Sequence, residues 1–230
     1  MFLVATPIGN LEDVTQRALR VLAEADLVAA EDTRHTRRLL ERHGIAGRLV
    51  SLFEHNERAR IPFLLAELAA GRAVAVVTDS GSPAVSDPGY PLVRAAVAAG
   101  VAVVSVPGPS AVIAALQVSG LPTDAFTFTG FLPVKSGARR RRLEELGERR
   151  ETIVAFETPH RIQACLADLE EVWGARPIAL ARELTKMHEE VLRGTAAEVR
   201  AALTPTKRRG EMVLVLSGKT RRDAETVRAS

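Results

Sequence analysis

Two short stretches of the chain gather carboxylates and cationic side chains. One reads Glu31-Asp32-Thr33-Arg34, and the other carries Arg182, Glu183, Lys186 and Glu189. A carboxylate can accept a proton from a hydroxyl group, and an arginine or lysine can orient phosphates or stabilise a forming oxyanion. Each cation can equally be half of an ion pair with a neighbouring glutamate, and Asp32 or Thr33 can simply cap the helix that follows. Both stretches are therefore candidates for acid–base chemistry on a phosphate-bearing substrate.

The elements that must position such groups are short apolar strands that end in polar loops. Ala73 to Val77 has the small and β-branched residues typical of a buried parallel strand, and it runs into a loop from Thr78 to Pro83. The same pattern joins residues 2–5 to Thr6-Pro7-Ile8-Gly9-Asn10 and residues 101–106 to Pro107-Gly108-Pro109-Ser110. Because open α/β sheets bind ligands outside the carboxyl ends of their strands, we expect these three loops to share one pocket.

Strands and helices alternate along the chain, which predicts an α/β fold with a mostly parallel sheet in its first half. A helix capped by Asn10 or Asp13 is expected over residues 11–25, and further strands over residues 126–129, 152–156, 177–181 and 211–216. We divide the chain into an N-terminal domain at residues 1–108, a C-terminal α/β domain at residues 109–220 and a flexible tail at residues 221–230.

Arg139 to Arg142 form a run of four arginines at the start of a predicted helix. They surround most of one helical turn, so nearby glutamates cannot pair with all of them. A phosphate-rich partner such as RNA would account for the excess charge, and a solvated helix start is the plainer interpretation.

Composition excludes several classes of protein. Lys and Arg number 31 against 28 acidic residues, and this small excess permits nucleic-acid binding without arguing for it. Cys165 is the only cysteine, which excludes an internal disulfide, and the five histidines lack metal-ligand spacing. No apolar stretch is long enough for a bilayer, so we expect a cytoplasmic protein with no membrane role. The loops match neither the P-loop nor the dinucleotide-binding pattern, which argues against a kinase or an ordinary dehydrogenase.

Several ordered motifs resemble those of the tetrapyrrole-methylase-fold enzymes. They are Thr6 to Asn10, Glu31 to Arg34, Thr78 to Pro83, Pro107 to Ser110, Gly130-Phe131-Leu132-Pro133, Glu157-Thr158-Pro159-His160-Arg161, Arg182 to Lys186 and Glu211-Met212-Val213. More narrowly, the set is similar to the ribosomal RNA small subunit methyltransferase I family. The resemblance implies two α/β domains with a cofactor cleft between them. It also implies a homodimer that uses S-adenosylmethionine to methylate a ribose 2′-oxygen of a decoding-centre cytidine in 16S rRNA, within the small ribosomal subunit.

The resemblance also implies the residues of the site. Those expected to bind the methyl donor are Pro7, Ile8, Gly9, Asp79, Ser80, Gly81, Ser82, Pro83, Ser110, Ala111, Phe131, Leu132, Met212 and Val213. Those expected to act on the substrate are Glu31, Arg34, Arg182, Glu183, Lys186 and Glu189, among which the sequence does not rank the glutamates as proton acceptors. Many members of the family continue beyond the last strand, so we expect this chain to hold RNA with its core surface or a dimer partner.

Two other functions are weighed against this one. A tetrapyrrole or other small-molecule methyltransferase would share the fold, but its cleft would be apolar and lined by aromatic residues. Here the loops instead bring charged groups, among them Glu31, Arg34, His160, Arg182 and Lys186. A non-catalytic RNA-binding protein of ribosome assembly would bind RNA whether or not the methyl donor is present.

Overall fold

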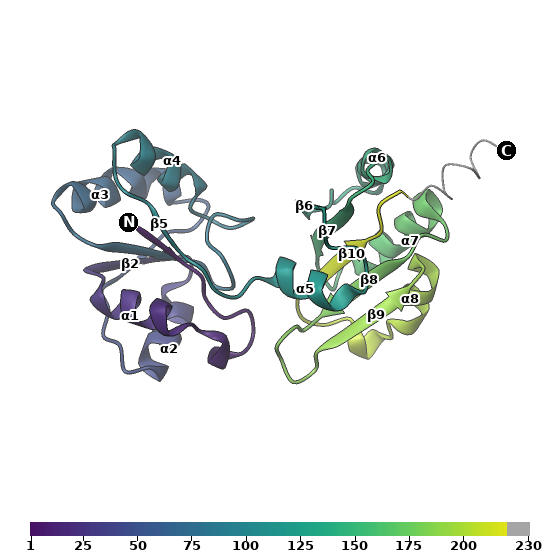
Figure 1. Cartoon of the computed structure of the whole chain (residues 1–230), viewed down its shortest axis with the longest axis horizontal. Helices are drawn as coiled ribbons and strands as arrows, with labels where there is room; N and C mark the ends of the chain where they lie inside the picture. The colour runs from purple at the N-terminus through teal and green to yellow at the C-terminus, as the bar shows by residue number, and fades with distance from the viewer. Residues whose placement is uncertain (220–230) are drawn as a thin grey trace. The chain divides into compact units, whose positions relative to one another are not determined.

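The structure is a computed structural model that describes residues 1–219 (Figure 1), and the tail predicted at residues 221–230 lies outside the described residues. The chain divides into two compact units, unit 1 from Met1 to Ser110 and unit 2 from Ala111 onward. Each unit contains one five-stranded sheet. Between residues 1 and 219, no helix is long and apolar enough to cross a bilayer.

Unit 1 is built on a sheet whose strands are all parallel and run in the order β3-β2-β4-β1-β5. The strands are β1 (Phe2–Val4), β2 (Leu27–Ala30), β3 (Leu49–Ser51), β4 (Val74–Val77) and β5 (Val104–Val106). β2 and β4 are buried along their whole length, which is why they consist of apolar residues, most of them small or β-branched. The parallel sheet predicted from the sequence is confirmed, and its central neighbours β1 and β4 are far apart in the chain.

Two pairs of helices cover the two faces of this sheet. They are α1 (Gln16–Glu24) and α2 (Thr33–Arg42), then α3 (Glu57–Ala69) and α4 (Tyr90–Ala98). Leu22 of α1 and Leu40 of α2 pack with Val28 of β2 in one cluster, whereas α3 and α4 pack with the alternate residues Leu27 and Ala29 in another. Successive residues of a strand face opposite sides of the sheet, so each pair of helices has its own face (Figure 1).

The helix predicted over residues 11–25 is wrong in its first part. Asn10 caps only a single turn of 3-10 helix, Leu11–Asp13, and α1 begins anew at Gln16. Between them the backbone of Val14 and Thr15 is extended, a conformation that β-branched residues favour. The Thr15 hydroxyl oxygen then accepts a 3.0 Å hydrogen bond from the N–H of Ala18, so Thr15 rather than Asp13 is the cap of α1.

Unit 2 contains a mixed sheet in the order β6-β7-β10-β8-β9. The strands are β6 (Phe126–Phe131), β7 (Thr152–Glu157), β8 (Ile178–Arg182), β9 (Glu190–Gly194) and β10 (Met212–Leu216). β6 and β7 are parallel, while β10 runs antiparallel to both of its neighbours and β9 antiparallel to β8. β10, the last strand of the described residues, is therefore the central strand of the sheet, and it is buried throughout.

The helices of unit 2 are α5 (Ala111–Ser119), α6 (Ser136–Gly147), α7 (Ile162–Trp173) and α8 (Ala196–Ala202). α7 contacts both α6 and α8, and all three contribute to one large core cluster that includes Leu143, Leu166 and Val199. α5 packs on β8, β9 and β10 and contributes no residue to that cluster. β9 was not expected from the sequence, because it is a short edge strand that keeps charged residues such as Arg193 among few apolar ones.

Candidate active site

The loops at the carboxyl edge of the unit 1 sheet lie together. The N–H of Thr6, after β1, donates to the Gly81 carbonyl at 2.9 Å, and the N–H of Gly81, after β4, donates back to Thr6 at 3.1 Å. Gly81 has a φ of +85°, a left-handed conformation that favours glycine. A Cβ atom there would lie 3.5 Å from Ile8 and 3.8 Å from the Pro109 carbonyl. The three loops that the sequence predicts to share one pocket therefore adjoin one another in the structure.

Carboxylates join this edge to the end of β2. Glu31 Oε2 accepts hydrogen bonds from the Thr78 hydroxyl at 2.6 Å and from the N–H of Asp79 at 3.3 Å. In return, Asp79 Oδ1 accepts from the N–H of Asp32 at 3.0 Å. Burial and the nearby negative charges of Glu31 and Asp32 raise the pKa of Asp79, although the hydrogen bond from Asp32 opposes them. Asp79 is thus a half-buried carboxyl group whose pKa is raised.

Arg34 lies at the exposed start of α2. Asp32 is the N-cap of this helix and accepts a 2.8 Å hydrogen bond from the N–H of Arg34. The guanidinium of Arg34, whose side chain is 87% exposed, pairs with the same carboxylate at 2.9 Å. The hydrogen bonds from Arg34 hold the pKa of Asp32 far below its usual range. Asp32 therefore has the capping role that the sequence left open.

A buried glutamate that sequence reasoning missed supports the long loop after β4. Glu57 is 5% exposed, and its Oε1 accepts hydrogen bonds from the N–H groups of Gly89 at 2.9 Å and Leu92 at 3.4 Å, at the start of α4. A carboxylate in this position complements the helix dipole. No sequence signal marks it, because its partners follow more than 30 residues later. Inside the same loop, Ala84 and Ser86 hold positive φ angles, so the loop has a defined and strained shape.

In unit 2, the strand register brings the remaining predicted residues to one edge of the sheet. Met212 pairs with Glu157 of β7 on one side and with Arg182 of β8 on the other. Phe131 pairs with Phe156 at the same end of the neighbouring strand. The side chains of Leu132 and Met212 belong to the hydrophobic core beneath α6, α7 and α8, whereas Phe131 is 52% exposed. Of the aromatic and apolar side chains predicted here, Phe131 is therefore the accessible one.

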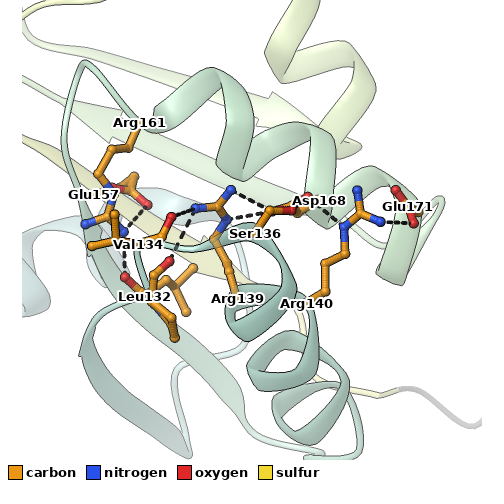
Figure 2. Close-up of polar contacts among 10 residues, drawn as sticks. Leu132, Val134, Ser136, Arg139, Arg140, Glu157, Arg161, Asp168 and Glu171 are labelled. Atoms are coloured by element: carbon orange, nitrogen blue, oxygen red, sulfur yellow. Dashed lines mark hydrogen bonds and ion pairs between the residues drawn. The ribbon is translucent and has the colours of Figure 1, made fainter.

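A buried glutamate also organises this edge. Figure 2 shows Glu157 beside Arg161, whose Nη2 donates to the Leu132 carbonyl at 2.5 Å. Glu157 Oε1 accepts a 2.8 Å hydrogen bond from the N–H of Thr158, and its other oxygen accepts a 3.4 Å hydrogen bond from Arg161 Nη2. The motif from Glu157 to Arg161 thus fixes the loop that follows β6.

Ion pairs and a hydrogen bond fix the loop from Arg182 to Glu190. Lys186 Nζ lies 3.1 Å from carboxylate oxygens of both Glu183 and Glu211. Burial lowers the pKa of Lys186, but these two carboxylates outweigh it and the net shift is upward. Glu189 accepts a 2.6 Å hydrogen bond from the N–H of Thr185. Glu183 and Thr185 hold positive φ angles of 51° and 66°, which cost conformational energy in non-glycine residues.

Gly210, which the sequence did not single out, makes room for this arrangement. A Cβ atom on Gly210 would lie only 1.7 Å from Glu183 Oε1, so any larger residue must displace that carboxylate. Next to it, Arg182 is 7% exposed and lines a groove of about 570 Å³ with His188, Glu190 and Lys207. Its Nη1 donates to the His188 carbonyl at 3.1 Å, while its Nε has no hydrogen-bond partner among the residues described.

The arginine run predicted to face RNA is largely structural. Arg139 is buried, and it pairs with the buried Asp168 at 2.6 Å and donates to the Pro133 and Val134 carbonyls (Figure 2). The run's second and fourth arginines, at positions 140 and 142, pair with Asp168, Glu171 and Glu145. Three of the four arginines therefore have carboxylate partners within the described residues, so neither an RNA contact nor a solvated helix start accounts for the whole run. Arg141 is the exposed member of the run.

Comparison with known proteins places these features in context. Residues 1–200 match the family of Tetrapyrrole (Corrin/Porphyrin) Methylases. The Ribosomal RNA small subunit methyltransferase I of Xylella fastidiosa is 48% identical over 99% of this chain and 84% of its own length. The protein of the same name from Neisseria meningitidis serogroup B is 51% identical over 94% of this chain and 75% of its own length. A uroporphyrin-III C-methyltransferase from Thermus thermophilus, solved with S-adenyl homocysteine, shares the fold with a TM-score of 0.63 and 20% identity, covering 100% of this chain and 99% of that one.

Proposed function

This chain belongs to the tetrapyrrole methylase family and, within it, to the ribosomal RNA small subunit methyltransferase I family, and from that premise we propose that it methylates a ribose 2′-oxygen of a cytidine in 16S rRNA. It is a methyltransferase that uses S-adenosylmethionine. The observation that carries the proposal is 48% identity spread over 99% of the chain, because relatives this similar across both units rarely differ in reaction. The fold alone would not carry it, since one fold serves many substrates.

The residues of the unit 1 edge fit the methyl donor. Among residues 1–219, Asp79 accepts a hydrogen bond only through Oδ1, which leaves its second oxygen to accept hydrogen bonds from amino or hydroxyl groups of a ligand. Ser80 and Ser82 beside it are half-buried, and Gly81 keeps the backbone free of a side chain. We assign this binding to Pro7, Ile8, Gly9 and residues 79–83, together with Ser110. From unit 2 we assign Ala111, Phe131, Leu132, Met212 and Val213.

When bound, S-adenosylmethionine supplies the methyl group, and its S–CH₃ bond breaks as the O2′–CH₃ bond forms, leaving S-adenosylhomocysteine and one proton. The protein must align the hydroxyl oxygen in line with that bond and accept its proton. The three candidate glutamates differ in their partners. Glu183 is held in an ion pair with Lys186, and Glu189 is exposed and accepts a hydrogen bond from the N–H of Thr185. In the described part of the chain, Glu31 accepts hydrogen bonds only from neutral donors and only through Oε2, so we assign the proton of the 2′-hydroxyl to Glu31.

The cations have a different role in this proposal. Lys186 stays protonated through the neutral range and Arg182 is always charged, so each can bind a phosphate or stabilise negative charge on the 2′-oxygen. Arg34 is exposed at the start of α2 and can reach a phosphate of the nucleotide at some cost to its pairing with Asp32. We assign all three to orienting the RNA.

The proposal includes an assembly and a place of action. We propose that the enzyme acts in the cytoplasm as a homodimer on the small ribosomal subunit rather than on free rRNA. Light scattering of the purified protein tests the dimer, and a comparison of assembled subunits with protein-free rRNA as methyl acceptors tests the substrate form.

The central experiment is transfer of labelled methyl groups from S-adenosylmethionine to unmodified small subunits, followed by nucleoside analysis of the product. We expect 2′-O-methylcytidine. No transfer to subunits or to free rRNA, with the methyl donor nevertheless bound, would overturn the proposal and favour a small-molecule methyltransferase. RNA binding that is independent of the methyl donor, together with no methyl transfer, would favour a non-catalytic protein of ribosome assembly.

A further inference from the structure

The helix α2 turns a strongly basic face to solvent. Its buried side consists of Thr36, Leu39 and Leu40. Its exposed positions include Arg37, Arg38 and Arg42, which we call the arginine face of α2, and also His35 and one acidic residue, Glu41. Arg34 continues this face toward the start of the helix. The helical period separates this face from the three buried positions of α2.

The charges of the arginine face have no counterpart within unit 1. Arg34 pairs with Asp32, but none of Arg37, Arg38 and Arg42 forms an ion pair among residues 1–219. Positions 34, 38 and 42 are spaced four apart, so like charges stand next to one another and disfavour the helix. Elsewhere in the described chain, the helical arginines at positions 142 and 200 have carboxylate partners, whereas those at positions 58, 60 and 94 form no ion pair but are not spaced four apart. The arginine face therefore weakens its own helix and is suited to an external anion.

The position of α2 connects this face to the candidate active site. The helix starts at Thr33, two residues after Glu31, at the carboxyl edge of β2. It has ten residues, so the face extends about 15 Å from that edge. A polyanion lying along it would have one end beside the carboxylates of Glu31 and Asp79.

We propose that the arginine face of α2 binds the phosphate backbone of the RNA substrate and delivers the target nucleotide to the edge beside Glu31; this inference rests on the proposed function. Arginine guanidinium groups bind phosphate oxygens through paired, charge-assisted hydrogen bonds. Such contacts contribute to binding affinity whatever the base sequence, and each releases counterions from the RNA. The face is therefore an anchoring surface, and sequence recognition lies elsewhere.

The test compares two variants of equal charge in the full-length protein. The first is R37Q/R38Q/R42Q, and the second is R58Q/R60Q/R94Q on α3 and α4. The control arginines are exposed on the opposite face of the same sheet and, within residues 1–219, form no ion pair. Glutamine has nearly the helix propensity of arginine, so both variants should keep the fold, which thermal unfolding checks. The probe is unmodified small-subunit rRNA, free and within the subunit, titrated at several salt concentrations.

We expect the α2 variant to lose at least about tenfold in RNA affinity, and the slope of log K against log [salt] to become shallower by about 2 to 3. Binding of S-adenosylmethionine, measured by calorimetry, should not change, and the control variant should bind RNA like the wild type. Equal losses in both variants would overturn the inference in favour of non-specific charge, and so would an unchanged slope for the α2 variant. If the wild type transfers no methyl to rRNA, the proposed function fails and this inference fails with it. If the wild type transfers and the α2 variant binds RNA equally well, only the inference fails.

Discussion

Glu31 and Thr78 are joined by a 2.6 Å hydrogen bond that connects the end of β2 to the loop after β4. The bond uses one carboxylate oxygen and leaves the other for a substrate. Glu31→Gln keeps an oxygen that can accept from Thr78 but removes the base. We expect kcat for methyl transfer to fall by about 10²-fold or more, with the affinity for S-adenosylmethionine nearly unchanged. Single-turnover kinetics and calorimetry measure the two quantities.

The matched variant is Glu31→Ala, which also removes the hydrogen bond to Thr78. We expect it to lose affinity for the methyl donor as well as rate, because the loop after β4 loses its tie to β2. A Glu31→Gln enzyme with the wild-type rate would show that Glu31 only positions this loop and that another group takes the proton.

Lys186→Ala removes the cation between Glu183 and Glu211. Because the ion pairs raise its pKa above the ordinary value of 10.5, Lys186 is charged below that pH and its stabilising contacts are lost only as the pH rises through the raised pKa. We expect Lys186→Ala to lower methyl transfer by roughly 10²-fold while donor binding is retained. Lys186→Arg keeps the charge and should recover part of the rate. A loss of donor binding in Lys186→Ala would contradict the assignment of Lys186 to the RNA.

Asp79→Asn should make stability less dependent on pH. Burial and the charges of Glu31 and Asp32 raise the pKa of Asp79, so the folded protein holds this proton more tightly than the unfolded chain does. Ionisation of Asp79 therefore costs stability as the pH rises above the ordinary value of 3.8. We expect Asp79→Asn to unfold at a higher temperature than the wild type at pH 7, with the difference shrinking toward pH 4, and to bind the methyl donor more weakly. A difference in Tm that stays constant between these pH values would contradict the stability argument.

Breaking the buried pair between Arg139 and Asp168 should destabilise unit 2. Removing Arg139 leaves the buried Asp168 with Arg140 as its remaining cation and takes the donor from the Pro133 and Val134 carbonyls, so we expect Arg139→Gln to lower the free energy of unfolding by about 2–4 kcal/mol. Trp173, the only tryptophan, lies in unit 2 and reports its urea unfolding by fluorescence. Arg141→Gln is the control, since its exposed side chain should change stability by less than about 0.5 kcal/mol. Equal effects of the two substitutions would refute the structural role of Arg139.

The pair of Arg139 and Asp168 should also make the stability of unit 2 fall at acid pH. Burial raises the pKa of Asp168, but hydrogen bonds from Arg140, Ser136 and Arg139 outweigh it and the net shift is downward. The stability that this carboxylate contributes is therefore present above its ordinary pKa of 3.8 and is lost as the pH falls through the lowered value. Asp168→Asn should flatten the acid limb of a plot of unfolding free energy against pH, which the Trp173 signal can follow.

Sequence reasoning succeeded where structure follows from local pattern. The strands β2 and β4 can be predicted because burial on both faces requires apolar residues throughout. The contact between Thr6 and Gly81 can be predicted because parallel strands end at the same edge of a sheet. Sequence reasoning failed where the role of a residue depends on a partner far away in the chain. Arg139 reads as a free cation until Asp168, 29 residues later, neutralises it. From the sequence Glu57 looks like an ordinary helix residue, because its hydrogen-bond partner at the start of α4 follows 32 residues later.

The order of strands in unit 2 has a consequence for synthesis. A growing chain releases β7 and β8 well before β10, the strand that separates them in the sheet. Until Leu216 leaves the ribosome, each of these strands presents an unpaired edge that can join another chain. Unit 1 has all its strands once Val106 has emerged. The nascent protein therefore passes through an interval in which the first unit has all its strands while the second still lacks its central one.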